Sequence, residues 1–280
     1  MPNLINYNGK FLDKDESIVN SNNRSFQYGD GLFETMRLSN GNVMFLKDHF
    51  ERLQRGAQYF KLQLPEYFSE DFFNQQILDT AESNDISLNG RIKLTIFRNG
   101  EGKYEPQTNE ANWLIKVTPL YRPDYQWNEE GLHLGIFDKA RKSCDEISNY
   151  KTTSSLLYVL AAVYKKESGF DESIILNTKG NIADTIYANL FLIKNEKIYT
   201  PALSEAPVDG VMRKQVLHLA KKQGYKVYEE AITINDLIGA DEVFLTNAIK
   251  GILWVKQFEN KLYTQEIAKQ LLNNLNELIE

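Results

Sequence analysis

The sequence predicts an α+β fold in two domains. Segments with strand and helix patterns are mixed along the 280 residues without regular β-α-β alternation, which argues against a doubly wound sheet. Several pairs of strand segments meet at tight turns, and Asn8-Gly9 is a residue pair that suits a hairpin. Residues 121–131 are polar, contain proline and lack a period, so we expect them to link a domain of residues 1–120 to a domain of residues 132–280.

The expected elements of the N-terminal domain follow from alternating and helical hydrophobic periods. A second hairpin turns at Asn40-Gly41, and the helix after it places Phe50 and Leu53 on one apolar face. The predicted elements are hairpins over 5–12 and 32–46, helices over 46–62 and 69–83, and strands over 91–97 and 112–120.

The C-terminal domain is predicted on the same grounds, with more strands. Its hairpins turn near Gly180 and at Asn195-Glu196. The predicted elements are a strand over 131–137, a buried helix over 153–166, hairpins over 172–184 and 189–201, a helix over 211–223, a strand over 226–233, short strands within 241–263 and an amphipathic helix from 264.

Composition excludes several functional classes. The net charge of −6, without a stripe of Lys or Arg, argues against nucleic-acid binding. No apolar run is long enough to span a membrane, and the first ten residues do not resemble a signal peptide. Three scattered histidines and the single Cys144 show no metal-ligand spacing, so we expect no metal. One cysteine also suggests a reducing compartment, and we expect a cytoplasmic protein.

The stretch ISNYKTTSSLLYVLAA places Lys151 among hydroxyl residues before an apolar helix. In one interpretation, Thr153, Ser154 or Ser155 caps that helix and Lys151 extends into water. In the other, Lys151 is a nucleophile. A free lysine has a pKa near 10.4, so a lysine that attacks a carbonyl needs burial or a nearby cation to lower its pKa.

Two stretches of the N-terminal half add candidate site residues. Gly29 and Gly31 flank Asp30, which indicates either a plain turn or a bend whose backbone passes close to another group. Arg52 lies beside the buried stripe of its helix. An arginine at such a position pairs with a carboxylate or holds an anion such as phosphate through its planar fork of donors.

The C-terminal half contains further polar residues in apolar surroundings. Asp184 shares a strand face with two isoleucines, so its carboxylate must be paired or neutralised. Val211 and Met212 open a helix whose free N–H groups suit a phosphate. Thr246 and Asn247 end a strand and offer a second candidate anion site.

Together these residues resemble a site for pyridoxal 5′-phosphate, a cofactor that acts as an electron sink. The chain resembles the fold-type IV pyridoxal-phosphate enzymes, which include branched-chain and D-amino-acid aminotransferases and 4-amino-4-deoxychorismate lyases. The most specific part of the resemblance lies in residues 184–213. The matching elements there are Asn189-Leu190-Phe191, Ile198-Tyr199-Thr200 and Val208-Asp209-Gly210-Val211-Met212-Arg213.

The resemblance implies a small N-terminal α/β domain and a larger C-terminal pseudo-barrel domain, with the cofactor between them in a homodimer. It makes Lys151 the Schiff-base lysine and the proton shuttle. The other expected residues are Arg52, Val211, Met212 and Thr246 for the phosphate, Asp184 for the ring nitrogen, Asn189 and Asn247 as further cofactor contacts, and Phe33, Thr35, Arg98 and Lys103 for the substrate.

One residue departs from the family pattern, because Asp184 stands where the family usually has glutamate. The aspartate is shorter by one carbon–carbon bond, about 1.5 Å. The ring therefore sits deeper, a water bridges the gap, or the ring nitrogen is protonated less fully. This departure keeps open the alternative of a non-catalytic binding relative.

Three details resemble the lyase group, which releases pyruvate and 4-aminobenzoate in folate biosynthesis. The segment FLTNAIKGILWV has its Thr-Asn-Ala ending, FRNGEGKY resembles its glycine-rich segment, and Leu156 replaces a tyrosine of branched-chain transaminases. Lys103 stands where the lyases have arginine, which loses bidentate recognition of a carboxylate. A class IV aminotransferase that uses branched-chain or D-amino acids with 2-oxoglutarate is the alternative.

Overall fold

The computed structural model describes residues 3–279 and confirms the α+β fold. The chain divides into two compact units. Unit 1 extends to Pro123 and includes Lys151–Ser155, while unit 2 contains Asp124–Tyr150 and the chain from Leu156 onward. The first boundary lies inside the predicted linker, but the short segment that carries Lys151 groups with unit 1 rather than with the C-terminal domain.

Unit 1 is built on a six-stranded antiparallel sheet in the order β2-β1-β6-β5-β3-β4. Its strands are β1 (Leu4–Tyr7), β2 (Lys10–Asp13), β3 (Gly31–Ser39), β4 (Asn42–Val43), β5 (Gly90–Arg98) and β6 (Ala111–Pro119). Its helices are α1 (Arg24–Tyr28), α2 (Leu46–Tyr59) and α3 (Glu70–Glu82). Both predicted Asn-Gly turns are confirmed, with positive φ at all four residues.

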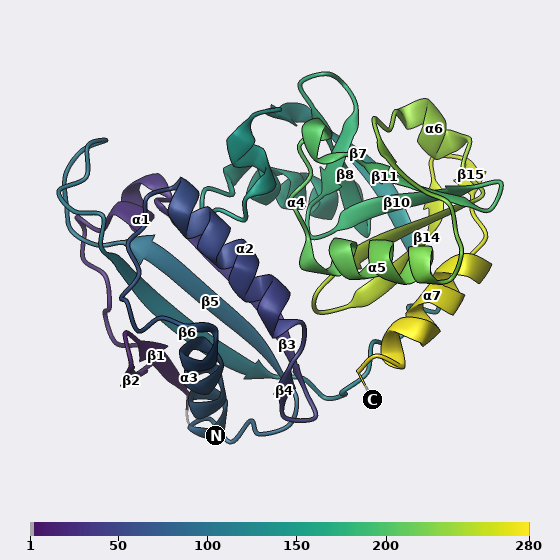
Figure 1. The fold of residues 1–280 in the computed structure, drawn as a ribbon. Coiled ribbons are helices and arrows are strands. Elements are labelled where there is room, and N and C mark those ends of the chain that lie inside the picture. The colour runs from purple at the N-terminus through teal and green to yellow at the C-terminus, as the bar shows by residue number, and fades with distance from the viewer. Residues whose placement is uncertain (1–2, 280) are drawn as a thin grey trace. The chain divides into compact units, whose positions relative to one another are not determined.

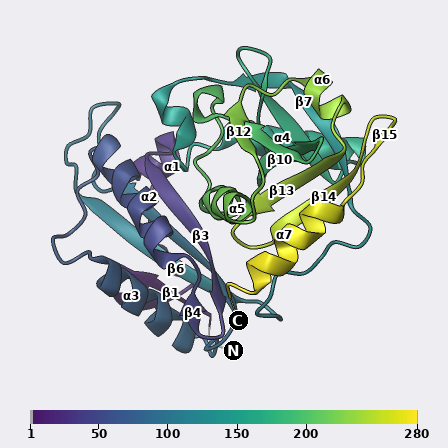
Figure 2. The same ribbon diagram turned by 45° about the vertical axis from the view of Figure 1, so that its right-hand side comes forward.

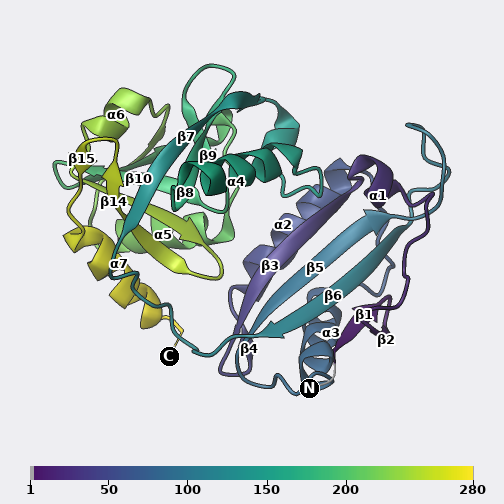
Figure 3. The ribbon, with the colours of Figure 1, turned by 180° about the vertical axis from the view of Figure 1, so that it is seen from behind.

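Helices α2 and α3 cover one face of this sheet, as Figures 1 and 3 show from opposite sides. The helices cover this face because it is apolar. Side chains alternate between the two faces along each strand, and Met36, Ile92 and Ile115 are fully buried on the covered face. The neighbouring residues Phe33 and Lys93 belong to the other face. The second face carries Phe33 and Lys93, whereas Glu34 belongs to the face that α2 covers.

Unit 2 is built on a nine-stranded mixed sheet in the order β12-β11-β10-β13-β14-β7-β8-β9, with β15 paired to β14. Strand β9 also contacts β10 and β11, so the sheet curls toward closure. The strands are β7 (Leu132–Lys142), β8 (Glu172–Asn177), β9 (Ile182–Thr185), β10 (Asn189–Lys194), β11 (Lys197–Pro201), β12 (Val227–Glu230), β13 (Glu242–Asn247), β14 (Gly251–Phe258) and β15 (Lys261–Leu262). This curled sheet matches the expected pseudo-barrel.

Four α-helices accompany the unit 2 sheet. They are α4 (Leu156–Ser168), α5 (Val211–Lys222), α6 (Ile234–Ile238) and α7 (Glu266–Asn276). Helices α5 and α7 contact each other and strand β13, as Figure 2 shows, while α4 packs on β7 and β8. The hairpins at Gly180 and Asn195-Glu196 form as predicted.

The largest correction concerns helix α4. It begins at Leu156, three residues later than predicted, because the Thr153 hydroxyl donates to the carbonyls of Gly29 and Gly31 instead of capping the helix. The helix is also not buried, since Ala161 is its one buried residue. Helices α1 and α6 and two short 3₁₀ turns, at 146–149 and 203–205, were not predicted.

Within residues 3–279, no helix combines the length and the apolar character needed to cross a membrane.

Candidate active site

Lys151 lies beside strand β3 because the segment around it bonds to that strand. The Phe33 N–H donates to the Lys151 carbonyl at 3.0 Å, and the Thr153 N–H donates to the Gly31 carbonyl at 2.9 Å. The Lys151 ammonium lies 4.4 Å from the centre of the Phe33 ring, a distance suited to a cation–π contact. The structure thus brings Lys151 together with one predicted substrate residue, Phe33.

The predicted close approach at Gly29 and Gly31 is confirmed. A Cβ atom at Gly29 would lie 2.9 Å from the Ser154 Cα, and Gly29 has a φ of 65°. A Cβ at Gly31 would lie 2.5 Å from the Ile96 carbonyl oxygen. A side chain at Gly29 would push the Lys151 segment away, whereas a side chain at Gly31 would push strand β5 away from β3.

Arg52 pairs with a carboxylate, as the first interpretation of its position predicts. Its guanidinium donates to both oxygens of Glu34 on β3, with Nε 2.8 Å from Oε1. His49, one turn earlier on α2, bonds the same carboxylate through Nδ1 at 2.7 Å. All three side chains are buried.

Charge and burial together fix the protonation of this cluster. Burial alone would raise the pKa of Glu34, but Arg52 and His49 outweigh it and hold the pKa at about 2. Burial lowers the pKa of His49 despite the neighbouring carboxylate. The imidazole is therefore neutral at pH 7, and its Nδ1–H donates to Glu34. Its Nε2 is then a buried acceptor with no partner among the described residues.

Asp184 on β9 is 2% exposed and is surrounded by donors. Lys142 Nζ lies 2.8 Å from Oδ2, and the Val208 N–H donates to the same oxygen at 2.9 Å. The Tyr158 hydroxyl also donates to Oδ2, and the Asn189 amide donates to Oδ1 at 2.9 Å. The prediction that this carboxylate must be paired is confirmed, and Asn189 holds it in place.

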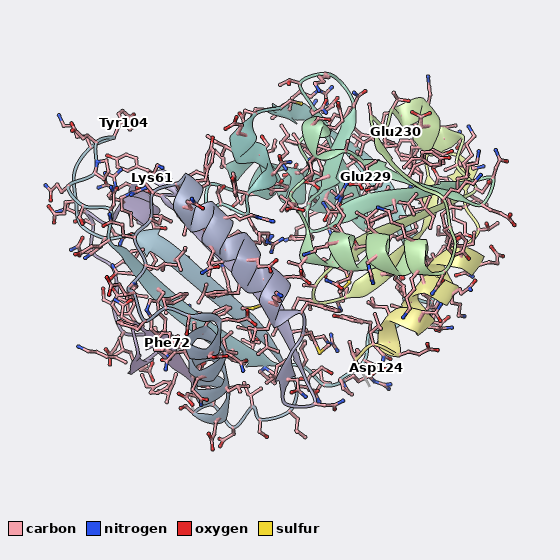
Figure 4. The ribbon with its side chains drawn as sticks, viewed as in Figure 1. Lys61, Phe72, Tyr104, Asp124, Glu229 and Glu230 are labelled. Carbon is pink, nitrogen blue, oxygen red and sulfur yellow. The ribbon has the colours of Figure 1, made fainter. Side chains whose placement is uncertain are left out.

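The start of α5 is suited to an anion. Its N-cap is Gly210, which offers no side-chain acceptor to the free N–H groups of Val211 and Met212. A Cβ at Gly210 would lie 1.9 Å from the Asn189 Oδ1, so a larger residue is excluded there. Arg213 in the same turn is used structurally, since it pairs at 2.8 Å with Glu229, labelled in Figure 4.

Thr246 and Asn247 end β13 as predicted, but their side chains differ in use. Asn247 Oδ1 accepts the N–H groups of Ile249 and Lys250 at 3.0 and 2.9 Å, which fixes the following turn. Thr246 is 1% exposed, and its hydroxyl has no hydrogen-bond partner among residues 3–279. An unsatisfied buried hydroxyl is costly, so it indicates a group that a ligand completes.

The remaining predicted substrate residues are less closely associated with Lys151. Arg98 is buried, and all three of its nitrogens donate to protein acceptors. These acceptors are Asp30 Oδ2, Asn109 Oδ1 and the carbonyls of Phe60 and of Lys61, which is labelled in Figure 4. These four bonds use four of the five N–H donors of Arg98, so the protein itself holds most of its guanidinium.

Lys103 and Thr35 complete the predicted substrate set. Lys103 is exposed in the loop between β5 and β6, next to Tyr104, which is 89% exposed and lies at the outer end of this loop in Figure 4. Thr35 is half-buried on β3, opposite Lys93 of β5.

Sequence reasoning missed several residues that contact the predicted ones, among them Glu34, His49, Lys142 and Tyr158. Glu34 and His49 carry a detectable signal, because each is polar at a buried position of a regular strand or helix. Lys142 carries none, since it follows two other basic residues at the end of β7. Among the described residues no cluster of His, Cys, Asp and Glu could hold a metal ion.

The residues of each unit have chemistry that fits one part of pyridoxal phosphate. In unit 2, the Thr246 hydroxyl and the uncapped start of α5 suit a phosphate, and Asp184 is a fixed carboxylate suited to a ring nitrogen. In unit 1, Arg52 is a guanidinium suited to a phosphate, and Lys151 is an amine suited to an aldehyde. The Phe33 ring offers an apolar surface beside this amine.

Comparisons with known proteins identify the relatives of this chain. Residues 31–258 match the family model described as amino-transferase class IV. The aminodeoxychorismate lyase of Vibrio harveyi is 30% identical, over 90% of this chain and 94% of that protein. The D-alanine aminotransferase of Bacillus licheniformis is 26% identical, over 91% of this chain and 88% of its own length.

A solved structure shows the same fold. The branched-chain aminotransferase of Thermoproteus uzoniensis superposes with a TM-score of 0.89 at 23% identity, covering 99% of this chain and 94% of that chain.

Proposed function

The chain belongs to the class IV aminotransferase family, whose members are pyridoxal-phosphate-dependent enzymes, and we propose that it is a 4-amino-4-deoxychorismate lyase. This reaction releases pyruvate and 4-aminobenzoate and needs no amino acceptor. The observation that carries the proposal is the end of β13, where the side chain of Asn247 fixes the turn. A glycine, as in the Thr-Gly-Thr ending of the branched-chain transaminases, has no side chain for these bonds.

Basic residues near Lys151 support the same substrate. Both products carry a carboxylate, so the substrate carries two. Lys93 lies 5.2 Å from the centre of the Phe33 ring that Lys151 also contacts. Desolvation and the nearby charges of Arg91 and Lys116 lower the pKa of Lys93. An anionic group would relieve this crowding of positive charge.

The proposed roles of the residues follow from their chemistry. When bound, the cofactor supplies an aldehyde that joins an amine covalently and a ring that withdraws electrons from the α-carbon. Arg52, Thr246 and the first N–H groups of α5 would hold the phosphate. Asp184 would accept a hydrogen bond from the ring nitrogen. The Lys151 amine would be displaced by the substrate amine and would then remove the α-proton.

Absorbance and product analysis test this proposal. Purified protein incubated with the cofactor should show a yellow band that borohydride bleaches. With aminodeoxychorismate and no keto acid, it should release pyruvate and 4-aminobenzoate. Activity that requires an amino acid together with 2-oxoglutarate would replace the lyase with an aminotransferase. A protein that stays colourless would contradict both reactions and favour a binding relative.

We also propose that the chain forms a homodimer, as its resemblance to the family implies. Helix α4 supports this proposal, because Leu156, Val159, Leu160 and Val163 form an exposed apolar stripe at helical spacing. Val163→Asp should halve the mass measured by light scattering, while the control Lys166→Asp, at an exposed polar position of the same helix, should not. A monomeric wild type would contradict the dimer.

A further inference from the structure

The oxygens of Asp184 are occupied unequally. Oδ2 receives three donors, which are Lys142, Tyr158 and the Val208 N–H, whereas the Asn189 amide is the one donor to Oδ1 among residues 3–279. A carboxylate oxygen offers about two lone-pair sites. Oδ2 is therefore saturated, and the remaining capacity for a ligand lies on Oδ1.

The position of Lys142 is fixed by its strand and by its burial. It is the last residue of β7, is 7% exposed, and its ammonium lies 2.8 Å from Asp184 Oδ2. The same ammonium lies 5.4 Å from the centre of the Tyr158 ring. Burial raises the pKa of Tyr158 well above its ordinary value, and Asp184 raises it further, so the hydroxyl stays a neutral donor.

A cation at this position changes what the carboxylate can do for a ligand. A carboxylate stabilises a protonated ring nitrogen through its negative charge. A lysine ammonium in contact with the same carboxylate opposes that effect, because it repels the proton of the ring nitrogen. Buried groups feel this repulsion strongly, since little water screens them.

We propose that Lys142 is a positioning residue that weakens the hold of Asp184 on the ring nitrogen of pyridoxal phosphate and so keeps this nitrogen less protonated. The inference rests on the proposed function. It assigns a role to the short acidic residue: Asp184 is paired with a lysine as well as with the ring, and the two cationic partners compete for one carboxylate. The strength of the electron sink is then set by Lys142 together with Asp184.

Nitrogen NMR of the protein loaded with ring-¹⁵N-labelled cofactor tests the proposal directly, because the ring resonance reports protonation without any turnover. Lys142→Gln keeps a donor to Oδ2 but removes the charge. Its ring resonance should move toward the protonated value relative to wild type. Lys142→Arg restores the charge and should return the resonance to the wild-type position.

Two further variants complete the experiment. Lys139→Gln removes an exposed charge from the same strand and should leave the resonance unchanged. Tyr158→Phe removes one donor from Oδ2 and should move the resonance in the same direction as Lys142→Gln, by a smaller amount. If Lys142→Gln does not fold, Lys142→Met, which removes the same charge, decides the question.

The outcomes separate this inference from the function on which it rests. A wild type that takes up no cofactor contradicts the proposed function itself. A loaded wild type whose resonance is unchanged in folded Lys142→Gln, or in Lys142→Met if the glutamine variant fails to fold, contradicts the role of Lys142 alone. A shift that Lys142→Arg does not reverse also overturns it, because the charge would then not be the cause.

Discussion

Each unit of the molecule contains a buried ion pair with a proposed cofactor group, and the two pairs offer opposite charges to the proposed cofactor. In unit 1 the proposed cofactor group is the cation Arg52, and Glu34 is its protein partner. In unit 2 the proposed cofactor group is the anion Asp184, and Lys142 is its partner. The protein therefore neutralises each buried charge before a ligand binds, which avoids the large cost of an unpaired charge.

The pairs also differ in how many hydrogen-bonding positions of the proposed cofactor group the protein already uses. Arg52 faces Glu34 through two parallel bonds, and the same carboxylate is shared with His49. Asp184 receives donors from three side chains and one backbone N–H, and keeps capacity on one oxygen. In each pair the partner residue, Glu34 or Lys142, therefore affects two things. It stabilises the buried charge, and it determines which hydrogen-bonding positions of Arg52 or Asp184 remain for a ligand.

Removing Glu34, the partner of Arg52 in unit 1, should have the largest effect on stability. Glu34→Ala leaves two nitrogen-bearing side chains buried without their carboxylate, so we expect a loss of about 3–5 kcal/mol in the free energy of unfolding. Urea unfolding of the cofactor-free protein measures it. Lys139→Ala breaks an exposed pair and should cost less than about 1 kcal/mol. Equal losses in both variants would show that the buried cluster adds no stability.

Glu172 sharpens the comparison, because backbone N–H groups of Ser173 and Ile186 hold this buried carboxylate. Burial raises its pKa from 4.5 to about 7. The folded state then binds the proton more tightly than the unfolded state. The resulting stability is fully present below about pH 4.5 and is lost as the pH rises to about 7, by at most about 3 kcal/mol.

Unfolding measured across this pH range checks that sign. Glu172→Gln should lose this part of the pH dependence, because glutamine does not titrate. Between pH 4.5 and pH 7 the free energy of unfolding should therefore fall less in Glu172→Gln than in wild type. A Glu172→Gln protein with the wild-type pH profile would show that Glu172 titrates normally.

Replacing Arg52 by lysine tests the functional side of the unit 1 pair. Arg52→Lys keeps the charge but loses the planar fork, so we expect the cofactor Kd to rise by about 10- to 100-fold. Absorbance titration of the cofactor measures it. The control Arg55→Lys, exposed one turn later on α2, should bind as wild type does. An unchanged Kd in Arg52→Lys would place the phosphate elsewhere.

The smallest expected effect comes from replacing Thr246. The test is the sign of the change in stability of the cofactor-free protein. In Thr246→Val an unsatisfied hydroxyl is lost, so the cofactor-free protein should not become less stable, while the cofactor Kd rises about fivefold, or about 1 kcal/mol. The control Thr200→Val loses a 2.8 Å bond to the Leu190 carbonyl and should be destabilised without a change in Kd. Destabilised Thr246→Val would mean that its hydroxyl already has a protein partner.

Local patterns predicted the elements well where local physics decides them. The Asn-Gly hairpins and the periods of α2, α3 and α5 were identified because turn geometry and an apolar face leave a direct trace in sequence. The start of α4 was predicted wrongly, because the hydroxyl of Thr153 is used by carbonyls more than 120 residues earlier in the chain. Tertiary bonds of this kind leave no local pattern.

The site was predicted in part for the same reason. The buried position of Asp184 requires a partner, but its identity depends on which strands are neighbours, and Lys142 lies 42 residues away on β7. Arg98 is a matching case, since its motif indicates a substrate contact while the fold supplies protein acceptors for its nitrogens. Residue types follow from the sequence, whereas partners follow from strand order.

The account depends on one covalent link, between the cofactor aldehyde and Lys151. Borohydride reduction of the loaded wild type, followed by peptide mass mapping, should place a single pyridoxyl group on the peptide that contains Lys151, and Lys151→Ala should remove it while Lys142 remains. A label on Lys142, the buried amine of unit 2, or a label that survives Lys151→Ala, would contradict the assignment of the catalytic amine.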